Sequence, residues 1–467
     1  MTRAHALARA ASAFDDGTLL AQLAPRVALA SESQEPSRAP LWRAYLDEGL
    51  APQLQSLGFA TQVFDNPIAG HPPLMIATRQ EPGASLRVLS YAHGDVVRGY
   101  APQWRNGRDP WRLQVEGDRW YGRGTADNKG QHSINLLALQ QVLAARGGQL
   151  GFSLTLLVEM GEETGSPGLR EFCLAQREAL AADLFLASDG PRLAAGRPTL
   201  FLGSRGAFNF DLSVDLRAGG HHSGNWGGLL RNPGTRLAHA IASLVDERGA
   251  IRVEGLRPPP LSAVVRQALA GVSFGGDPGD PAIDADWGEP GLSPAERVIG
   301  WNALEVLAFK TGNPEAPVNA IPGQARCHAQ LRFVVGSDSG RFLSHLREHL
   351  DQHGFSDVQV SPSGTVMEAS RLDPADPWVG WALHSMAQST GKTPVLLPNL
   401  GGSLPNDIFS DDLGLPTLWV PHSYPACSQH APDEHLLGSV AREALQLMAG
   451  LWWDLGEAPA AACRAAG

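Results

Sequence analysis

The sequence has few cysteines, little positive charge and no long apolar run. Its four cysteines are scattered and form no C-x-x-C pair, which excludes a disulfide framework and a cysteine-ligated zinc site as organising features. The formal net charge of −11 leaves no general basic field, so we expect no nucleic-acid partner. No apolar segment approaches the roughly 18 residues needed to cross a bilayer, so we expect no membrane partner either.

The N-terminal segment has the composition of an ordinary first helix. Residues 1–14 contain Arg3 and Arg9, several alanines and no acidic residue, which weakly resembles a transit peptide. They lack the long apolar core of a secretory signal. We therefore interpret this segment as an amphipathic helix of a cytoplasmic protein.

Strand-like and helix-like segments alternate through the first 200 residues. The pattern predicts buried strands at 86–93, 152–159 and 184–188 and a helix at 128–146. Ser166 and Pro167 form a capping residue and N1 proline typical of a helix start. This alternation predicts an α/β fold with a mainly parallel sheet and helices on both faces.

The pattern changes in the middle of the chain. Residues 207–216 and 325–335 alternate like half-exposed antiparallel strands, and residues 256–300 form a long insertion rich in Pro, Gly and Asp. Beyond Asp373 the α/β pattern returns. The predicted organisation is a discontinuous α/β domain over 1–204 and 370–467, with an inserted α+β domain over 205–369.

Ionisable side chains follow three of the predicted strands. They are His93 and Asp95 after the first, Glu162 and Glu163 after the second, and Asp189 after the third. An adjacent Glu pair is usually a solvated turn, and an Asp-Gly pair is usually a plain turn. Three such clusters at the carboxyl ends of strands, where open α/β sheets bind ligands, instead indicate a functional site.

Two further residues extend this set. Asp127 stands at the predicted start of a helix, where a plain N-cap is the alternative interpretation. His430 lies in a Pro-rich segment that also contains His422 and His435. Imidazoles and carboxylates without thiolates are typical ligands of catalytic zinc or manganese.

Eight short motifs occur in order along nearly the whole chain. They are HGD at 93–95, GTADNKG at 124–130, GEETGS at 161–166, SDG at 188–190, HSG at 222–224, NAIP at 319–322, GGSLP at 401–405 and HAPDE at 430–434. Together they resemble the carnosinase, succinyl-diaminopimelate desuccinylase and glutamate carboxypeptidase family of di-zinc metallopeptidases. The resemblance implies that the α/β domain is catalytic and that the inserted domain is a lid used for dimerisation.

The resemblance implies two zinc ions per subunit, with Mn²⁺ or Co²⁺ as possible substitutes. Asp127 would bridge the two ions. His93 and Asp189 would complete one site, and Glu163 and His430 the other. Such a pair activates a bridging hydroxide as the nucleophile for amide hydrolysis.

The resemblance also assigns roles to two more residues of the α/β domain. Asp95 would hold the second nitrogen of His93 and fix its tautomer. Glu162 would act as general base and acid. Since successive side chains at a strand end face opposite ways, Glu163 can bind metal while Glu162 faces the substrate.

The resemblance also assigns substrate contacts. His222, preferred over the adjacent His221 because it begins the HSG motif, would polarise the scissile carbonyl, often across a dimer. Arg332 would bind the substrate carboxylate through its forked guanidinium. Further substrate contacts are expected from Asn319, Gly402 and Ser403. Without the resemblance, a surface His and an ordinary strand Arg would be the preferred interpretations, and homodimerisation through the lid rests on it alone.

The predicted function is hydrolysis of an amide bond in a small peptide or N-acyl amino acid with a free carboxylate. Asp189, where many family carboxypeptidases and acylases have Glu, and the long inserted domain favour a dipeptidase. An N-acyl amino acid amidohydrolase or a carboxypeptidase on the same scaffold is the main alternative. A non-catalytic peptide-binding protein is disfavoured because every expected catalytic position is filled.

Three other motifs lack the context that their chemistry requires. The H-x-x-E-H pattern at 345–349, extended by His353, lies beside an apolar stripe, so these histidines are expected to flank a packed face. The G-x-S-x-G pattern at 271–275 precedes a loop instead of a helix. Gly391-Lys392-Thr393 lacks the earlier glycine of a phosphate-binding loop.

Overall fold

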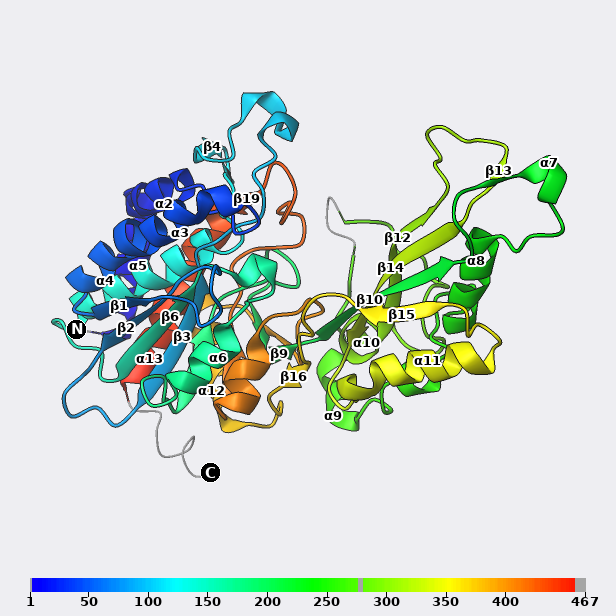
Figure 1. Cartoon of the computed structure of the whole chain (residues 1–467). Helices are drawn as coiled ribbons and strands as arrows, with labels where there is room; N and C mark the ends of the chain where they lie inside the picture. The colour runs from blue at the N-terminus through cyan, green and yellow to red at the C-terminus, as the bar shows by residue number, and fades with distance from the viewer. Residues whose placement is uncertain (1, 276–279, 458–467) are drawn as a thin grey trace.

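The computed structural model describes residues 2–275 and 280–457, which form two lobes (Figure 1). The larger lobe contains an eight-stranded sheet in the order β1-β2-β6-β3-β7-β18-β8-β17. The smaller lobe contains a four-stranded sheet in the order β12-β14-β10-β15. Cys463 and the end of the predicted segment 370–467 lie outside the described residues.

The centre of the large sheet is parallel and buried. β3 (Arg87–His93) lies between β6 (Ser153–Glu159) and β7 (Leu184–Ala187), and β18 (Thr417–Trp419) continues the sheet beyond β7. Val88 packs into the core on one face and its neighbour Leu89 into the core on the other. The strands read as continuous apolar runs because both faces are covered. The predicted α/β class is confirmed.

Helices cover both faces of this sheet. One face is covered by α1 (Arg3–Asp15), α2 (Thr18–Ala28), α5 (Lys129–Ala145), α12 (Pro377–Thr390) and α13 (Gly438–Gly456). The other is covered by α6 (Leu169–Ala175) and the turn at Ile408–Asp412. α5 is buried on nearly every side because α1, α2 and α13 pack against it.

One predicted helix start is wrong. Ser166 does not cap α6, which begins at Leu169 after Gly168, a residue with a φ of 81°. Ser166 itself has a φ of 51°, and its hydroxyl donates a hydrogen bond to Glu159. The polar partner offered by the end of β6 therefore outweighs the local capping preference.

The smaller lobe is an antiparallel sheet with helices on one face. Its strands are β10 (Gly206–Asp215), β12 (Ala303–Thr311), β14 (Gln324–Phe333) and β15 (Gln359–Pro362). α8 (Pro233–Leu244) and α11 (Phe342–Gln352) pack on one face through alternate strand residues. The other face carries the remaining alternate side chains, including Arg332. The insertion contains α9 (Ala263–Leu269) and α10 (Pro294–Gly300).

The chain crosses between the lobes at two paired strands. β9 (Gly203–Ser204) leaves the large lobe, and β16 (Ser370–Arg371) returns antiparallel to it.

Other helices and strands complete the two lobes. They are α3 (Ala39–Ala44), α4 (Ala51–Ser56), α7 (Ser223–Trp226), β1 (Ala60–Phe64), β2 (Leu74–Arg79), β4 (Gln114–Glu116), β5 (Arg119–Tyr121), β8 (Thr199–Phe201), β11 (His221–His222), β13 (Ala320–Ile321), β17 (Val395–Leu397) and β19 (His435–Leu437). Within the described ranges, no helix has the length and apolar character to cross a membrane.

Candidate metal centre

The parallel strands bring three polar segments to one edge of the large sheet. His93 is the last residue of β3 and is in register with Glu159 at the end of β6. Glu163 follows β6, and Asp189 follows β7. Since the carboxyl ends of parallel strands share one edge, these side chains converge there.

Five side chains form two groups that share Asp127. His93 Nε2 lies 2.9 Å from Asp127 Oδ1 and 3.5 Å from Asp189 Oδ2. On the other side, His430 Nε2 lies 3.1 Å from Asp127 Oδ2 and 3.0 Å from Glu163 Oε2. Within each group, one ligand atom of every member lies within 4.8 Å of the others. Asp127 thus offers one oxygen to each group, the arrangement of a bridging carboxylate.

The donor set fits a pair of divalent cations. Three carboxylates and two imidazoles are ligands that zinc and manganese accept. Asp189 Oδ2 is buried and has no hydrogen-bond partner among the described residues. A buried carboxylate oxygen without a donor is costly unless a cation is bound to it.

The electrostatics of the cluster also favour bound cations. Burial raises the pKa of Glu163 to about 7, and the nearby Asp127 carboxylate acts in the same direction. At His93, burial disfavours the charged ring, but the carboxylates of Asp127, Asp189 and Asp95 outweigh it and raise the pKa well above its usual value. Buried carboxylates at this spacing repel one another, and bound cations relieve that repulsion.

Asp95 connects two parts of the site. Its Oδ1 lies 3.3 Å from His93 Nδ1, which leaves Nε2 facing Asp127 and Asp189. The same carboxylate accepts hydrogen bonds from the backbone N–H groups of Glu162 at 3.2 Å and Glu163 at 3.1 Å. His93 Nδ1 is also hydrogen-bonded to the Asp95 carbonyl at 3.2 Å, so this one fully buried residue orients the His93 ring and anchors the turn that carries both glutamates.

The two adjacent glutamates lie on a turn and not at the end of a strand. Glu162 and Glu163 lie on a 3₁₀ turn, Glu162–Thr164, so the expected strand geometry is wrong. The Glu163 side chain contacts His430. Glu162 is half-buried. Burial raises the pKa of Glu162 well above its usual value, opposed by His93 and reinforced by Glu163. A carboxyl group in such surroundings holds a proton more readily than a solvated one, as a general acid and base requires.

Glu434 organises the Asp127 loop and was not predicted as a site residue. Its Oε1 accepts hydrogen bonds from the N–H groups of Ala126 at 2.9 Å and Asp127 at 3.1 Å. It also accepts from the Gly124 N–H and pairs with Arg123 at 2.8 Å, while only 1% exposed. A sequence signal for Glu434 exists, because this residue is the last of the HAPDE motif that begins at His430.

The alternative interpretation of Asp127 as a plain helix cap is wrong. The N-cap of α5 is Asn128, which makes no side-chain capping bond, and the peptide bond between the two residues is cis. Both Asp127 oxygens face histidines instead. Gln429, also not predicted, donates a hydrogen bond to Asp127 Oδ2 beside His430.

Three of the predicted substrate residues gather where the lobes meet. Arg332 Nη1 donates a 2.6 Å hydrogen bond to Ser403 Oγ, which in turn donates to the Arg205 carbonyl at 2.6 Å. The carbonyl of Gly402 accepts from the Arg205 N–H at 3.1 Å. Burial lowers the pKa of Arg332. A partly desolvated guanidinium at this junction suits a carboxylate partner.

The other two predicted substrate residues lie elsewhere. His222, in β11, is paired with Ala320 of β13, and the Ser223 N–H donates to the Asn319 carbonyl at 2.9 Å. Both His222 and Asn319 are exposed. The adjoining α7 and β13 lie at the end of the small lobe farthest from the large lobe (Figure 1). The chain therefore does not bring these residues to its own metal groups.

The histidines of the H-x-x-E-H pattern border a packed face, as expected. Phe342, Leu346 and Leu350 are buried in the small-lobe core. His349 Nε2 is hydrogen-bonded to the Ser243 carbonyl at 2.8 Å. Neither candidate metal group found in the described part of the chain includes these histidines.

Comparison with known proteins agrees with this geometry. The family model "Peptidase family M20/M25/M40" matches residues 89–454. The cysteinylglycine-S-conjugate dipeptidase of Corynebacterium striatum is 29% identical over 367 residues, which cover 76% of each chain.

Two solved structures share the fold over almost the whole chain. The dipeptidase Dug1p of Saccharomyces cerevisiae matches with a TM-score of 0.80 and 20% identity, covering 97% of this chain and 99% of the other. The M20 family metallo-carboxypeptidase Sso-CP2 of Sulfolobus solfataricus matches with a TM-score of 0.79 and 23% identity, covering 93% and 98%. The resemblance predicted from the eight motifs is confirmed, and the chain belongs to peptidase family M20/M25/M40.

Proposed function

We propose that this chain is a zinc-dependent dipeptidase with two metal ions per subunit. The observation that carries the proposal is the pair of three-residue groups that share Asp127, with Glu162 beside them. The name of the Corynebacterium striatum relative, a dipeptidase, supports the substrate class. Mn²⁺ and Co²⁺ are possible substitutes because the donors are imidazoles and carboxylates.

The residues of the chain have separate tasks in this reaction. When bound, two divalent ions supply Lewis acidity that activates water and stabilises developing negative charge. Glu162 takes the proton of the attacking water and delivers it to the leaving amine. Asp95 and Glu434 are positioning residues, since they hold His93, the Glu162 turn and the Asp127 loop.

Substrate recognition involves the free carboxylate. Arg332, held by Ser403 at the junction of the lobes, is the proposed carboxylate-binding residue. Gly402 and Ser403 border the same position. Such a site recognises a free carboxylate next to an amide bond, and N-acyl amino acids and longer peptides carry both groups. An N-acyl amino acid amidohydrolase or carboxypeptidase is therefore the second candidate on this scaffold.

We further propose that two copies of the chain assemble through the small lobe. β12 is an edge strand whose Val306, Leu307 and Phe309 are 42%, 55% and 43% exposed. Unpaired edges with exposed apolar side chains favour pairing with another strand. In such a dimer, His222 and Asn319 at the end of the lid act in the site of the partner subunit.

A substrate panel tests the proposed reaction. The chain is stripped with a chelator, reloaded with Zn²⁺, Mn²⁺ or Co²⁺, and assayed on dipeptides such as Cys-Gly and β-Ala-His and on N-acyl amino acids. We expect metal-dependent hydrolysis of dipeptides and no turnover by the stripped protein. Cleavage of N-acyl amino acids alone would establish the second candidate, and hydrolysis of neither class would contradict both.

A further inference from the structure

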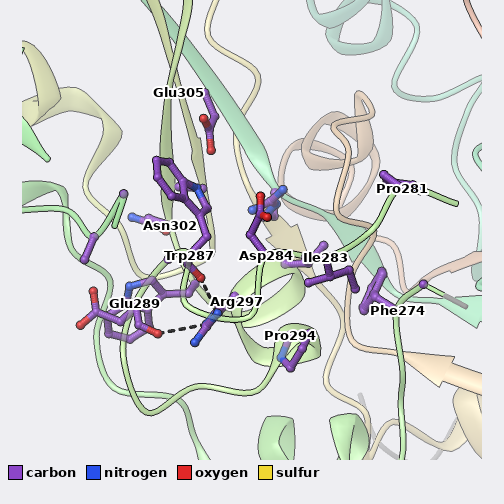
Figure 2. A pocket seen from close by; sticks show the side chains of 18 of the residues that line it. Phe274, Pro281, Ile283, Asp284, Trp287, Glu289, Pro294, Arg297, Asn302 and Glu305 are labelled. Atoms are coloured by element: carbon purple, nitrogen blue, oxygen red, sulfur yellow. Dashed lines mark hydrogen bonds between the residues drawn. The ribbon is translucent and has the colours of Figure 1, made fainter. Parts of the chain in front are cut away.

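A cavity of about 480 Å³ lies where the insertion of the small lobe folds against β12 (Figure 2). Its wall also includes Leu193 and Pro425 of the large lobe. Leu193 lies four residues after Asp189, and Pro425 lies five residues before His430. The cavity therefore borders the loops that carry the metal-site residues, and its size is within the usual range of small-molecule sites.

The wall supplied by the insertion is largely apolar. Phe274, Ile283, Trp287 and Pro294 line it, with the Trp287 ring between the insertion and β12 (Figure 2). Trp287 and Ile283 are each 50% exposed. A ligand that covers these two side chains would remove from water the apolar surface that the chain itself leaves exposed, which favours binding.

The cavity wall also contains a buried arginine and a buried donor that has no hydrogen-bond partner among the described residues. Arg205 is only 9% exposed, and its Nε donates to the Gly401 carbonyl at 2.7 Å. The same guanidinium interacts electrostatically with the Glu305 carboxylate of the cavity wall and with Arg332. Trp301, which also lines the cavity, has a buried Nε1 with no partner in that same part of the chain. Buried donors in this state favour a ligand that brings an acceptor.

Arg205 places the cavity beside the proposed carboxylate position. Its carbonyl accepts from Ser403 Oγ, the same hydroxyl that accepts from Arg332. Across the sheet, Glu305 of the cavity wall is in register with Gln330, which accepts a 2.8 Å hydrogen bond from Arg332 Nε. A carboxylate held by Arg332 would therefore lie near the part of the cavity wall formed by Arg205 and Glu305.

We propose that this cavity is a specificity subsite for a bulky apolar side chain on the substrate residue that carries the free carboxylate. The inference rests on the proposed peptidase function and names its substrate class more closely. The carboxylate lies between Arg332 and Arg205, and the side chain on the same carbon extends toward Trp287. Asp284 and Glu305 on the wall disfavour an acidic side chain there.

Matched variants of the insertion test the subsite by turnover. Ile283→Ala and Trp287→Ala remove apolar wall, whereas Val264→Ala removes a 49% exposed side chain of α9 that does not line the cavity. We expect the wall variants to lower kcat/KM for Gly-Phe and Gly-Trp roughly tenfold or more, and for Gly-Gly less than about twofold. Val264→Ala should change none of these values. Equal losses on Gly-Gly and Gly-Trp, or no loss on either, would overturn the proposal.

A binding measurement separates the subsite from the proposed reaction. Calorimetry with the metal-loaded Glu162→Gln protein should show tighter binding of Gly-Trp than of Gly-Gly, and Trp287→Ala in that background should remove the difference. If the unmodified chain cleaves no dipeptide but this difference is present, the subsite stands and the proposed reaction fails. Equal affinities for the two peptides, or no binding of Gly-Trp, would overturn the subsite.

Discussion

The two lobes hold their candidate functional residues in different ways. In the large lobe, five candidate ligands from separate segments converge, and Asp95 and Glu434 fix the loops that carry them. In the small lobe, His222 and Asn319 are exposed at the far end, whereas Arg332 reaches the junction. The large lobe thus offers both candidate ligand groups by itself, whereas the proposed recognition by the lid would depend on how the lobes and two copies of the chain are arranged.

This contrast separates the effects of substitutions. Changes in the large lobe should act in every subunit independently of protein concentration. Changes at His222 or Asn319, at the far end of the lid, should act through the partner subunit and therefore depend on assembly.

The largest effect is expected for Glu162→Gln. The amide cannot accept the proton of the attacking water, so kcat should fall by about 10²- to 10⁴-fold. Metal content should be unchanged, because Glu162 belongs to neither ligand group. Steady-state kinetics and elemental analysis of the same sample measure both quantities. Substantial turnover by a fully loaded variant would rule out this role for Glu162.

His222→Ala should also be strongly impaired, and mixing tests where this residue acts. Reassembled with the Glu162→Gln protein, mixed dimers would contain one site with an intact Glu162 and an intact partner His222. An equal mixture should recover about a quarter of the unmodified activity, since half the dimers are mixed and each has one complete site. No recovery after confirmed subunit exchange would show that His222 does not act across a dimer.

A smaller effect is expected for Glu434→Gln, which weakens the acceptor for the Asp127 loop. Metal affinity should fall by about 10- to 100-fold, as is usual when a residue that orients a ligand is changed. Competition with a chromophoric chelator measures this change. Glu116→Gln, at an exposed carboxylate, is the control. Equal affinities in the two variants would remove Glu434 from its positioning role.

The smallest effect is expected at the edge of the lid sheet. Val306→Lys places a charge on the exposed edge of β12 and should raise the dimer dissociation constant about tenfold. Light scattering across a dilution series measures it, with Ile68→Lys on the large lobe as a similarly exposed control. The metal content should be the same in both variants. If Val306→Lys assembles as the unmodified chain does, the contact lies elsewhere.

Much of the large lobe could be predicted from the sequence because a topological rule connects distant residues. Once three apolar runs are assigned to parallel strands, His93, Glu163 and Asp189 must share one edge. This rule does not reach Glu434, which acts through backbone N–H groups; only its place at the end of the HAPDE motif indicates it. The Glu162 turn was predicted as a strand end because local alternation does not reveal the two hydrogen bonds to Asp95.

The lid was less accessible to prediction for a different reason. The register that places Arg332 near Ser403 depends on how two separate lobes meet, and no local pattern encodes it. In the proposed dimer, the position of His222 relative to a catalytic site would depend on a second copy of the chain. The cavity beside Arg205 is built by an insertion without regular periodicity, so its apolar wall emerges only from the folded chain.

The number and position of bound metal ions show whether the large lobe holds the proposed pair of cations. Anomalous diffraction from zinc-loaded crystals, supported by elemental analysis, should locate two ions per chain about 3.5–4 Å apart, with Asp127 between them. Asp127→Ala should lose both ions, and Asp189→Ala should lose the one on the His93 side. A single ion, or ions bound away from His93, Asp127, Glu163, Asp189 and His430, would contradict the account.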